Sequence, residues 1–146
     1  MGILSSFNTS ATGLTAQRLR MSVIANNLAN IDTTRTPSGD PYRRQFVIFE
    51  SILAKAGEVR TLKEEHLPRS LGVAVSGIIE DTSSPRLVYE PGHPDANEEG
   101  YVAFPNIDPV TEMVDMISAT RAYEANVTAI NSAKTMAMRA LEIGRA

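Results

Sequence analysis

Cysteine and tryptophan are both absent from this chain of 146 residues, and aromatic residues make up only 5% of it. Without cysteine there is no disulfide framework, no thiol nucleophile and no cysteine-based metal site. The scarcity of aromatic side chains argues against a thick aromatic core. Hydrophobic residues still account for 42% of the chain, which is near the globular norm and argues against wholesale disorder.

Long apolar runs and an excess of one charge are missing as well. No run approaches the roughly 18 apolar residues of a membrane-spanning helix. The net charge is −3 with both signs mixed throughout, and without a basic stripe we expect neither nucleic acid nor a membrane surface as a partner. The N-terminal residues lack the basic and apolar regions of a cleavable secretory signal, so we expect a cytoplasmic protein or one exported by another route.

Proline is absent from both ends, and its distribution divides the chain. All eight prolines lie between Pro37 and Pro109. Because proline interrupts helices, the two proline-free ends are predicted to be helical, and their seven-residue repeats predict that they form a coiled-coil-like pair. We therefore expect an α+β fold in three parts: an N-terminal helix within residues 1–34, a β-rich and irregular middle at 35–105, and a long C-terminal helix within 106–146.

The stretch from Asp108 to Ile143 is predicted to be one continuous helix. Asp108 is a good N-cap, because its carboxylate can accept hydrogen bonds from the free N–H groups of the first turn. Pro109 then occupies the first helical position, where its missing N–H costs nothing. Such a helix is roughly 50 Å long, which exceeds the roughly 30 Å diameter of a compact domain of this size. The helix therefore needs a long partner, from its own chain or from another.

Residues in this helix repeat at the seven-residue spacing that is typical of a coiled-coil seam. One predicted row is Met113, Thr120, Val127, Lys134 and Leu141, and the other is Met116, Tyr123, Ile130 and Ala137. A separate stripe of small residues, which we expect to face another neighbour, comprises Ala122, Ala129, Ala133 and Ala140. An ordinary amphipathic helix in a bundle would give a similar pattern.

Residues 3–31 form a second predicted helix, which is the obvious but shorter partner within the chain. Its apolar residues also repeat every seven positions, at Phe7, Leu14, Met21 and Leu28. Serine, threonine, asparagine and glycine crowd its first turns, and these residues have poor helix propensity. We therefore expect this helix to depend on packing and to fray at its ends in an isolated monomer.

The middle contains four segments that are predicted to be extended. Residues 45–53 alternate partly in polarity, and residues 71–80 are rich in apolar side chains. A turn at 83–85 then leads to a returning strand at 86–89, so the expected hairpin pairs the second and third segments. Residues 101–104 form a short extended piece before the final helix.

Residues that could support catalysis or bind a metal are few and scattered. The two histidines, His66 and His93, lack the number and spacing of partners that a metal site needs. Asp95, Glu98 and Glu99 lack the glycine-spaced pattern of a calcium loop, so we interpret them as a solvated acidic loop. No phosphate-binding glycine loop or nucleophile elbow occurs. We therefore expect no catalytic residue, no cofactor, no metal and no enzyme activity.

Asparagine is concentrated at the end of the first helix, in the sequence IANNLANIDTT at residues 24–34. A helix stop accounts for one asparagine, because this residue favours helix C-termini and left-handed backbone. The three at Asn26, Asn27 and Asn30 exceed that need. Since an amide both donates and accepts, we expect them to bond backbone groups of neighbouring chains and to set the register of an assembly.

These residues resemble the signatures of bacterial flagellar rod and hook proteins. SVIANNLANIDTT at residues 22–34 is similar to the N-terminal signature, which is built around Asn-Leu-Ala-Asn and a following threonine. NIDP at 106–109, followed by EMVDMI at 112–117 and RAYEAN at 121–126, is similar to the C-terminal signature. YRRQ at 42–45 and the short total length resemble the proximal rod members of the family.

The resemblance implies a structural subunit of the basal-body rod, which transmits torque from the motor ring to the hook for flagellum-dependent motility. It implies a helical assembly across the periplasm, reached through the flagellar type III export apparatus without a cleavable signal. The implied partners are copies of the chain, other rod proteins, and motor-ring and export-gate proteins at the rod base. The alternative is a cytoplasmic coiled-coil module with a regulatory or chaperone-like role, which predicts a small closed oligomer.

The residues expected at subunit interfaces are helix-seam positions together with polar residues of the N-terminal signature. In the first helix and its connector they are Phe7, Leu14, Met21, Asn26, Asn27, Leu28, Asn30 and Thr34. In the last helix they are Met113, Met116, Ile117, Tyr123, Asn126, Val127, Ile130 and Leu141. Each apolar side chain that is fully buried at such an interface contributes roughly 1.5–3 kcal/mol before entropy costs.

Overall fold

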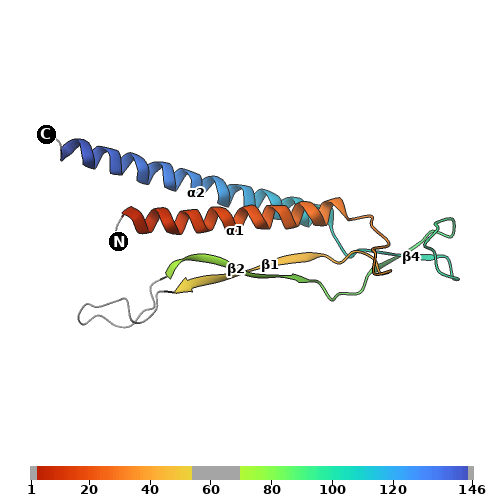
Figure 1. Cartoon of the computed structure of the whole chain (residues 1–146). Coiled ribbons are helices and arrows are strands. Elements are labelled where there is room, and N and C mark those ends of the chain that lie inside the picture. The colour runs from red at the N-terminus through yellow and green to blue at the C-terminus, as the bar shows by residue number, and fades with distance from the viewer. Residues whose placement is uncertain (1–2, 54–69, 145–146) are drawn as a thin grey trace.

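The computed structural model describes residues 3–53 and 70–144 of the chain. These residues form two long helices with short strands between them (Figure 1). In chain order the elements are α1 (Ile3–Ala29), β1 (Gln45–Leu53), β2 (Ser70–Glu80), β3 (Arg86–Tyr89), β4 (Tyr101–Phe104) and α2 (Pro109–Ile143). The predicted α+β class is confirmed, and both predicted helices are present.

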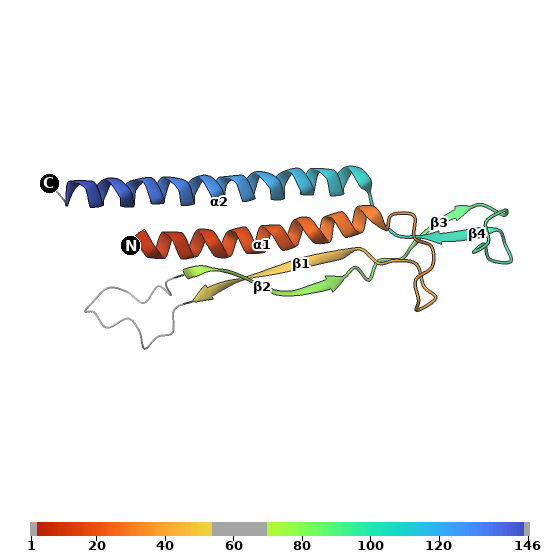
Figure 2. The same cartoon turned by 45° about the horizontal axis from the view of Figure 1, so that its top comes forward.

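The helix α1 is the middle layer of the molecule. The helix α2 runs antiparallel along one side of it, and the ribbon of β1 and β2 lies along the other side (Figure 1 and Figure 2). The two chain ends lie at one end of the molecule, and the ribbon of β3 and β4 projects from the opposite end (Figure 2). The accessible surface is 10884 Å², whereas a compact protein of 15.8 kDa exposes about 7,300 Å². The chain is therefore elongated and buries little of its own surface.

The strands pair in two separate antiparallel ribbons. Gln45 of β1 lies opposite Glu80 of β2, and Tyr89 of β3 lies opposite Tyr101 of β4. The predicted hairpin between the second and third segments is therefore wrong, although both segments are strands. With 9 residues in β1 and 11 in β2, their ribbon satisfies more backbone groups than the 4 residues of β3 could satisfy in β2.

The strand β2 rests directly on α1 at Gly72. The φ angle of this residue is +147°, which favours glycine, and a Cβ there would lie 2.3 Å from the Thr12 Oγ1. The Thr12 hydroxyl accepts a hydrogen bond from the Val73 N–H at 3.2 Å. The Thr9 hydroxyl donates to the Leu71 carbonyl at 3.3 Å. The missing side chain therefore allows the ribbon to bond the helix surface directly.

The helix α2 begins as predicted, with Asp108 as its N-cap. The Asp108 carboxylate accepts from the Val110 N–H at 3.3 Å and from the Thr111 N–H at 3.1 Å. The Thr111 hydroxyl also donates to it, at 2.5 Å. This hydroxyl bond, followed by the backbone bonds, holds the pKa of Asp108 below its ordinary value of 3.8. The helix then continues without interruption for 35 residues.

One of the two predicted seam rows on α2 is displaced by one residue. Glu112, Ala119 and Ala133 are buried, and they share their seven-residue spacing with Asn126, which lies against Gly13 of α1. The predicted row is instead exposed at three of its five positions, which are Met113, Lys134 and Leu141. Two polar residues occupy the buried row, so no apolar pattern marks it in the sequence.

The other predicted helix faces need the same kind of correction. Ala133 is buried within the chain while Ala129 and Ala140 are exposed, so the small-residue stripe does not face another neighbour as a whole. The predicted row on α1 is only half-buried at each of its positions, Phe7, Leu14, Met21 and Leu28. The buried side chains of α1 are Ala16, Val23, Ile24 and Asn27.

Candidate functional site

Five charged or amide side chains meet where α1, the start of β1 and the start of α2 converge, and we call them the polar cluster. They are Arg20 and Asn27 from α1, Arg44 from the segment just before β1, and Glu112 and Asp115 from the first turns of α2. The contact between Arg20 and Asp115 joins residues that are 95 positions apart. The polar cluster therefore connects the two ends of the chain.

Asn27 is bonded at every position that its amide offers. Its side chain is 1% exposed. Its Nδ2 donates to the Gln45 carbonyl at 3.0 Å and to the Glu112 Oε2 at 3.1 Å. Its Oδ1 accepts from the Gln45 N–H at 2.9 Å and from the Tyr42 hydroxyl at 3.2 Å. The two donors and two acceptor sites are all used within the chain, which corrects the expectation that Asn27 bonds a neighbouring one.

Arg44 and Glu112 form the ionic centre of the polar cluster. Glu112 is 1% exposed, and its Oε1 contacts both the Nε and the Nη2 of Arg44. The same Nη2 lies 3.5 Å from the Asp115 Oδ2, and Arg20 donates to the Asp115 Oδ1 at 2.9 Å. Two cations therefore balance two anions. A buried carboxylate such as that of Glu112 is strongly destabilising unless it is paired in this way.

Two aromatic side chains adjoin the polar cluster. The Phe46 ring lies under the Arg44 guanidinium, whose Cζ is 4.5 Å from the ring centroid, as in a cation–π contact. Burial raises the pKa of the Tyr42 hydroxyl, and the negative charges of Glu80 and Glu112 raise it further. Tyr42 therefore keeps its proton at neutral pH and remains a donor to Asn27.

The polar cluster fixes how α1 sits against α2. A seam with seven-residue spacing would pack in a similar way if one helix slid along the other by one repeat. Such a slide would separate Asn27 from Glu112 and Arg20 from Asp115. Buried polar groups that lose their partners cost about 1–3 kcal/mol each, and more when they are charged. The geometry thus supports positioning of the two helices against each other.

The other polar residues of the N-terminal signature lie at the helix end and in the connector. Asn26 is exposed. Asn30 donates back to the Asn26 carbonyl at 2.9 Å and accepts from the Thr33 hydroxyl at 3.1 Å, so its amide closes the end of α1. Thr34 donates to the Asp95 carboxylate at 2.8 Å and thereby joins the connector to the loop between β3 and β4.

The predicted interface residues fall into three groups by exposure. Asn27 is buried inside the chain. The exposed group is Asn26, Met113, Ile117 and Leu141. The half-buried group is Phe7, Leu14, Met21, Leu28, Asn30, Thr34, Met116, Tyr123, Asn126, Val127 and Ile130. Contact of the last two groups with a neighbouring subunit stays a prediction.

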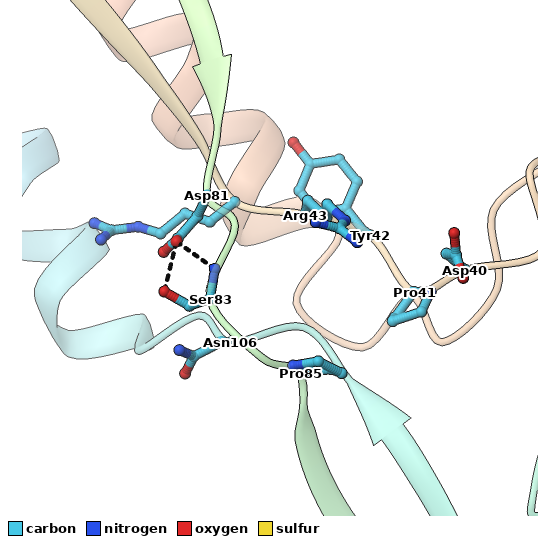
Figure 3. A pocket seen from close by; sticks show the side chains of 9 residues that line it. Asp40, Pro41, Tyr42, Arg43, Asp81, Ser83, Pro85 and Asn106 are labelled. Carbon is cyan, nitrogen blue, oxygen red and sulfur yellow. Dashed lines mark hydrogen bonds between the residues drawn. The ribbon is translucent and has the colours of Figure 1, made fainter.

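A shallow hollow of about 230 Å³ lies between the segment before β1 and the turn after β2. Figure 3 shows Asp81 and Ser83 side by side in it, with Asn106 nearby. The Ser83 hydroxyl donates to Asp81 at 2.6 Å and its N–H donates at 2.8 Å. These bonds, the hydroxyl first, hold the pKa of Asp81 below its ordinary value. A carboxylate that accepts from the N–H two residues later in the chain forms an Asx turn.

The described residues contain neither a group of metal ligands nor a membrane-spanning helix. Within residues 3–53 and 70–144, no three histidine, aspartate or glutamate side chains gather to hold a metal ion. His93 accepts from the Asp95 N–H at 3.1 Å within its own loop, and His66 lies outside the described residues. None of the described helices combines the length and apolar character needed to cross a membrane.

The pairing of Arg44 with Glu112 was not predicted from the sequence. A signal was available in the seven-residue spacing, since Glu112 precedes the inward-facing Ala119 by seven positions. A carboxylate on the inner face of a helix needs a cation. The arginines at 43 and 44, which follow the connector directly, were the candidates to supply it.

Comparison with known proteins places the chain among flagellar proteins. A profile described as "Flagella basal body rod protein" matches residues 7–35, and one described as "Flagellar basal body rod FlgEFG protein C-terminal" matches residues 98–143. The first region contains Arg20 and Asn27, and the second contains Glu112 and Asp115, so the helix-to-helix contacts of the polar cluster join the two matched regions.

Relatives that share nearly the full length of the chain carry the name "Flagellar basal-body rod protein FlgC". The chain is 50% identical to the one from Borreliella burgdorferi over 98% of both proteins. It is also 50% identical to the one from Bacillus subtilis, covering 99% of this chain and 100% of the relative. The one from Salmonella typhimurium is 39% identical, again over 99% and 100%. This chain therefore belongs to the family of flagellar basal-body rod proteins.

Proposed function

We propose that the chain is a structural subunit of the bacterial flagellar rod, in the proximal part of the basal body. The single observation that carries the proposal is 50% identity over nearly the whole length to proteins named flagellar basal-body rod proteins. The proposed place is the periplasm, between the motor ring and the hook. The proposed activity is the transmission of torque for motility, and no catalytic step is involved.

The exposed surface supports an assembly role. Large apolar side chains are exposed on the strands and on α2, with Phe49 on β1, Ile79 on β2, Leu87 on β3, and Met113 and Leu141 on α2 as examples. Larger apolar patches on a protein surface mark interaction sites. We propose that they contact copies of the chain, other rod proteins, and motor-ring and export-gate proteins at the rod base. Contacts between different faces generate an open helical assembly when the rotation between neighbours does not close a ring.

The contacts of the polar cluster support a role for the chain as a subunit that carries mechanical load. Torque on a rod subunit acts partly as a force that slides α1 along α2, and the small side chains of the seam offer little resistance to sliding. Arg44 contacts Glu112 and Asp115 together, and Arg20 contacts Asp115 from the other helix. Sliding would have to break these contacts in a partly buried site, where they are strong.

We propose in addition that the chain reaches the periplasm through the flagellar type III apparatus without removal of a signal. The poor helix propensity of the first turns of α1 supports easy unfolding for transport. The absence of cysteine supports it too, because no disulfide has to be broken before the chain is threaded.

Deletion of the gene in its own organism tests the proposed function. We expect the deletion strain to be non-motile and to lack complete rods, and the intact gene to restore both. We also expect the chain in isolated basal bodies. Normal swimming of the deletion strain, with the chain confined to the cytoplasm as a small closed oligomer, would instead support the alternative of a cytoplasmic coiled-coil module.

A further inference from the structure

The ribbon of β3 and β4 projects from the end of the molecule opposite to the two chain ends, and its two faces differ (Figure 2). Residues directly opposite each other in an antiparallel pair share a face, and successive residues of a strand alternate between the faces. Val102, which is 0% exposed, lies on the buried face. Its neighbours along β4 therefore lie on the opposite face, Tyr101 beside Tyr89 and Ala103 beside Leu87.

We call Leu87, Tyr89 and Tyr101 the outer face. Leu87 and Tyr89 are each 63% exposed, and Tyr101 is 40% exposed. Among the described helices and strands, β3 and β4 lie against only each other. Exposed apolar surface marks interaction sites, and tyrosine is enriched in the contacts between proteins. The outer face is therefore a surface that suits a partner from outside the chain.

The tyrosine rings of the outer face are held in position. The rings of Tyr89 and Tyr101 pack edge to face, with centroids 5.4 Å apart. The Tyr89 ring also lies against Gly100, where the φ angle is +82° and an added Cβ would be 2.9 Å from the ring. Side chains that are already ordered lose little conformational entropy when a partner binds. The outer face is thus a preformed contact surface.

Three exposed carboxylates adjoin the outer face in the chain, those of Glu90, Glu98 and Glu99. Hydrogen bonds fix the loop that carries them. The Glu90 N–H donates to the Gly100 carbonyl at 2.9 Å, and the Asn97 carboxamide accepts from the Glu99 N–H at 3.0 Å. The ion pairs within residues 3–53 and 70–144 include none of these three carboxylates. They are therefore available to a cationic partner.

The negative charge of the chain is concentrated at this end of the molecule. Residues 86–104 contain one arginine and four carboxylates, so their net charge of −3 equals that of the whole chain. One of the four, Asp95, is paired with Arg35 at 3.7 Å. A surface with this excess of one sign attracts a basic partner and repels an acidic one.

We propose that the outer face and its three carboxylates together bind a segment of another basal-body protein that is rich in lysine or arginine. This inference rests on the proposed function, because it needs the chain to be assembled with other proteins. A long basic side chain has an apolar stem and a charged head. The stem covers a tyrosine ring, to which the cation is also attracted, and the head reaches a carboxylate. Aromatic rings beside carboxylates satisfy both parts at once.

A second copy of the chain does not offer such a segment among its described residues. The exposed cations of its helices are Arg18, Arg121, Lys134 and Arg139. The nearest two of them, Lys134 and Arg139, are five positions apart. In the segment between α1 and β1, Arg35 and Arg44 are already paired within the chain. The bound segment therefore belongs to a different protein.

Two sets of substitutions isolate the contribution of the charge. The first set replaces the three loop carboxylates by amides of the same shape, with Glu90→Gln, Glu98→Gln and Glu99→Gln. The matched control set removes the same charge from exposed positions elsewhere, with Glu50→Gln, Glu124→Gln and Glu142→Gln. Because every changed side chain is exposed, both sets are expected to unfold at the temperature of the parent, as circular dichroism measures.

Photo-crosslinking in isolated basal bodies is the first measurement. A benzophenone amino acid replaces Tyr89, and mass spectrometry identifies the peptide that becomes linked to it. We expect a peptide from another protein with a net positive charge, and at least about fivefold less of it with the first set than with the control set. Leu87, on the same face, is the second position for the label if the label at Tyr89 prevents assembly.

Titration of the purified full chain with the linked peptide, made synthetically, is the second measurement. Because salt screens exposed charges, we expect Kd to rise at least about fivefold from about 50 mM to about 300 mM salt. Tyr89→Ala is expected to raise Kd by a similar factor, because it removes the ring that a basic side chain covers. Tyr89→Phe keeps the ring and is expected to keep Kd near that of the parent.

Four outcomes would overturn the proposed contact. They are a link to a second copy of the chain, a link to a neutral or acidic peptide, equal linking with the two variant sets, and no link although the chain is present in basal bodies. In each of these cases the presence of the chain in basal bodies leaves the proposed function standing. Absence of the parent chain from basal bodies overturns both.

Discussion

The amide of Asn27 and the carboxylate of Glu112 meet at 3.1 Å, although 85 positions separate them in the chain. Both side chains are 1% exposed. Arg44 pairs with the same carboxylate, so helix, connector and helix meet at one buried point. Substitutions at this point are expected to have the largest effects on the stability of the subunit.

Glu112→Ala is expected to lower the free energy of unfolding by about 1–3 kcal/mol, because the Asn27 Nδ2 loses its buried acceptor and Arg44 keeps only its longer contact with Asp115. Urea denaturation followed by circular dichroism measures the change. Glu98→Ala is the matched control, since Glu98 is exposed in the loop between β3 and β4. The control is expected to stay within about 0.5 kcal/mol of the parent. A loss below about 1 kcal/mol for Glu112→Ala would contradict the role given to this pair.

Asn27→Ala and Asn26→Ala change adjacent residues, and together they test which side chain acts in the stability of the subunit and which acts in its assembly. Asn27→Ala leaves the N–H and carbonyl of Gln45 without their partner and is expected to cost roughly 1–3 kcal/mol. Asn26→Ala changes an exposed side chain and is expected to leave the monomer unchanged within about 0.5 kcal/mol. If Asn26 contacts a neighbouring subunit, swimming in soft agar falls while stability does not. Equal stability of the two variants would argue against the inward role of Asn27.

Gly72→Ala is expected to destabilise the contact between β2 and α1. The φ angle of +147° is unfavourable for alanine, and the new Cβ would lie 2.3 Å from the Thr12 Oγ1. A residue forced into such a conformation costs roughly 1–3 kcal/mol. Gly77→Ala in the same strand is the control, because no atom lies within 4 Å of its added Cβ. The thermal unfolding midpoints of the two variants are the measurement, and equal midpoints would contradict the close contact between Gly72 and Thr12.

The cap of α2 is expected to weaken in acid. Because the folded pKa of Asp108 lies below that of an unfolded aspartate, about 3.9, its stabilising effect is complete above that value. The effect is lost as the pH falls through the folded pKa. Thr111→Val removes the hydroxyl donor and should raise the pKa of Asp108, whereas Thr111→Ser should preserve it. Carboxyl NMR titration measures both, and an unchanged pKa in Thr111→Val would disprove the assignment.

The two helices could be predicted from the sequence because their signals are local. All prolines lie after α1 and no farther along the chain than the first residue of α2, and Asp108 with Pro109 marks a helix start that the structure confirms. Local signals also located the strands. They did not determine the pairing, because a tight turn at 83–85 favours a hairpin that the longer ribbon of β1 and β2 prevents.

The polar cluster was not predicted from apolar periodicity, because its members are polar and lie far apart in the chain. Periodicity detects apolar side chains, and Glu112 and Asn126 in the buried row of α2 therefore broke the pattern that would have revealed it. The asparagines of the N-terminal signature were recognised as exceptional. Their division into the inward Asn27, the capping Asn30 and the exposed Asn26 depends on where the helix meets β1, which is a tertiary contact.

The central place of α1 has a consequence for the order in which the subunit folds. Thr12 bonds to a strand 61 positions later, and Arg20 bonds to a helix 95 positions later. Contacts over such distances form slowly, because a long loop must close before they are made. A chain that emerges N-terminus first can pair α1 with the β1–β2 ribbon early, but the side of α1 that faces α2 stays unpaired until the final helix has arrived. An incomplete copy leaves Arg20 without Asp115 and Asn27 without Glu112, which distinguishes it from a finished subunit.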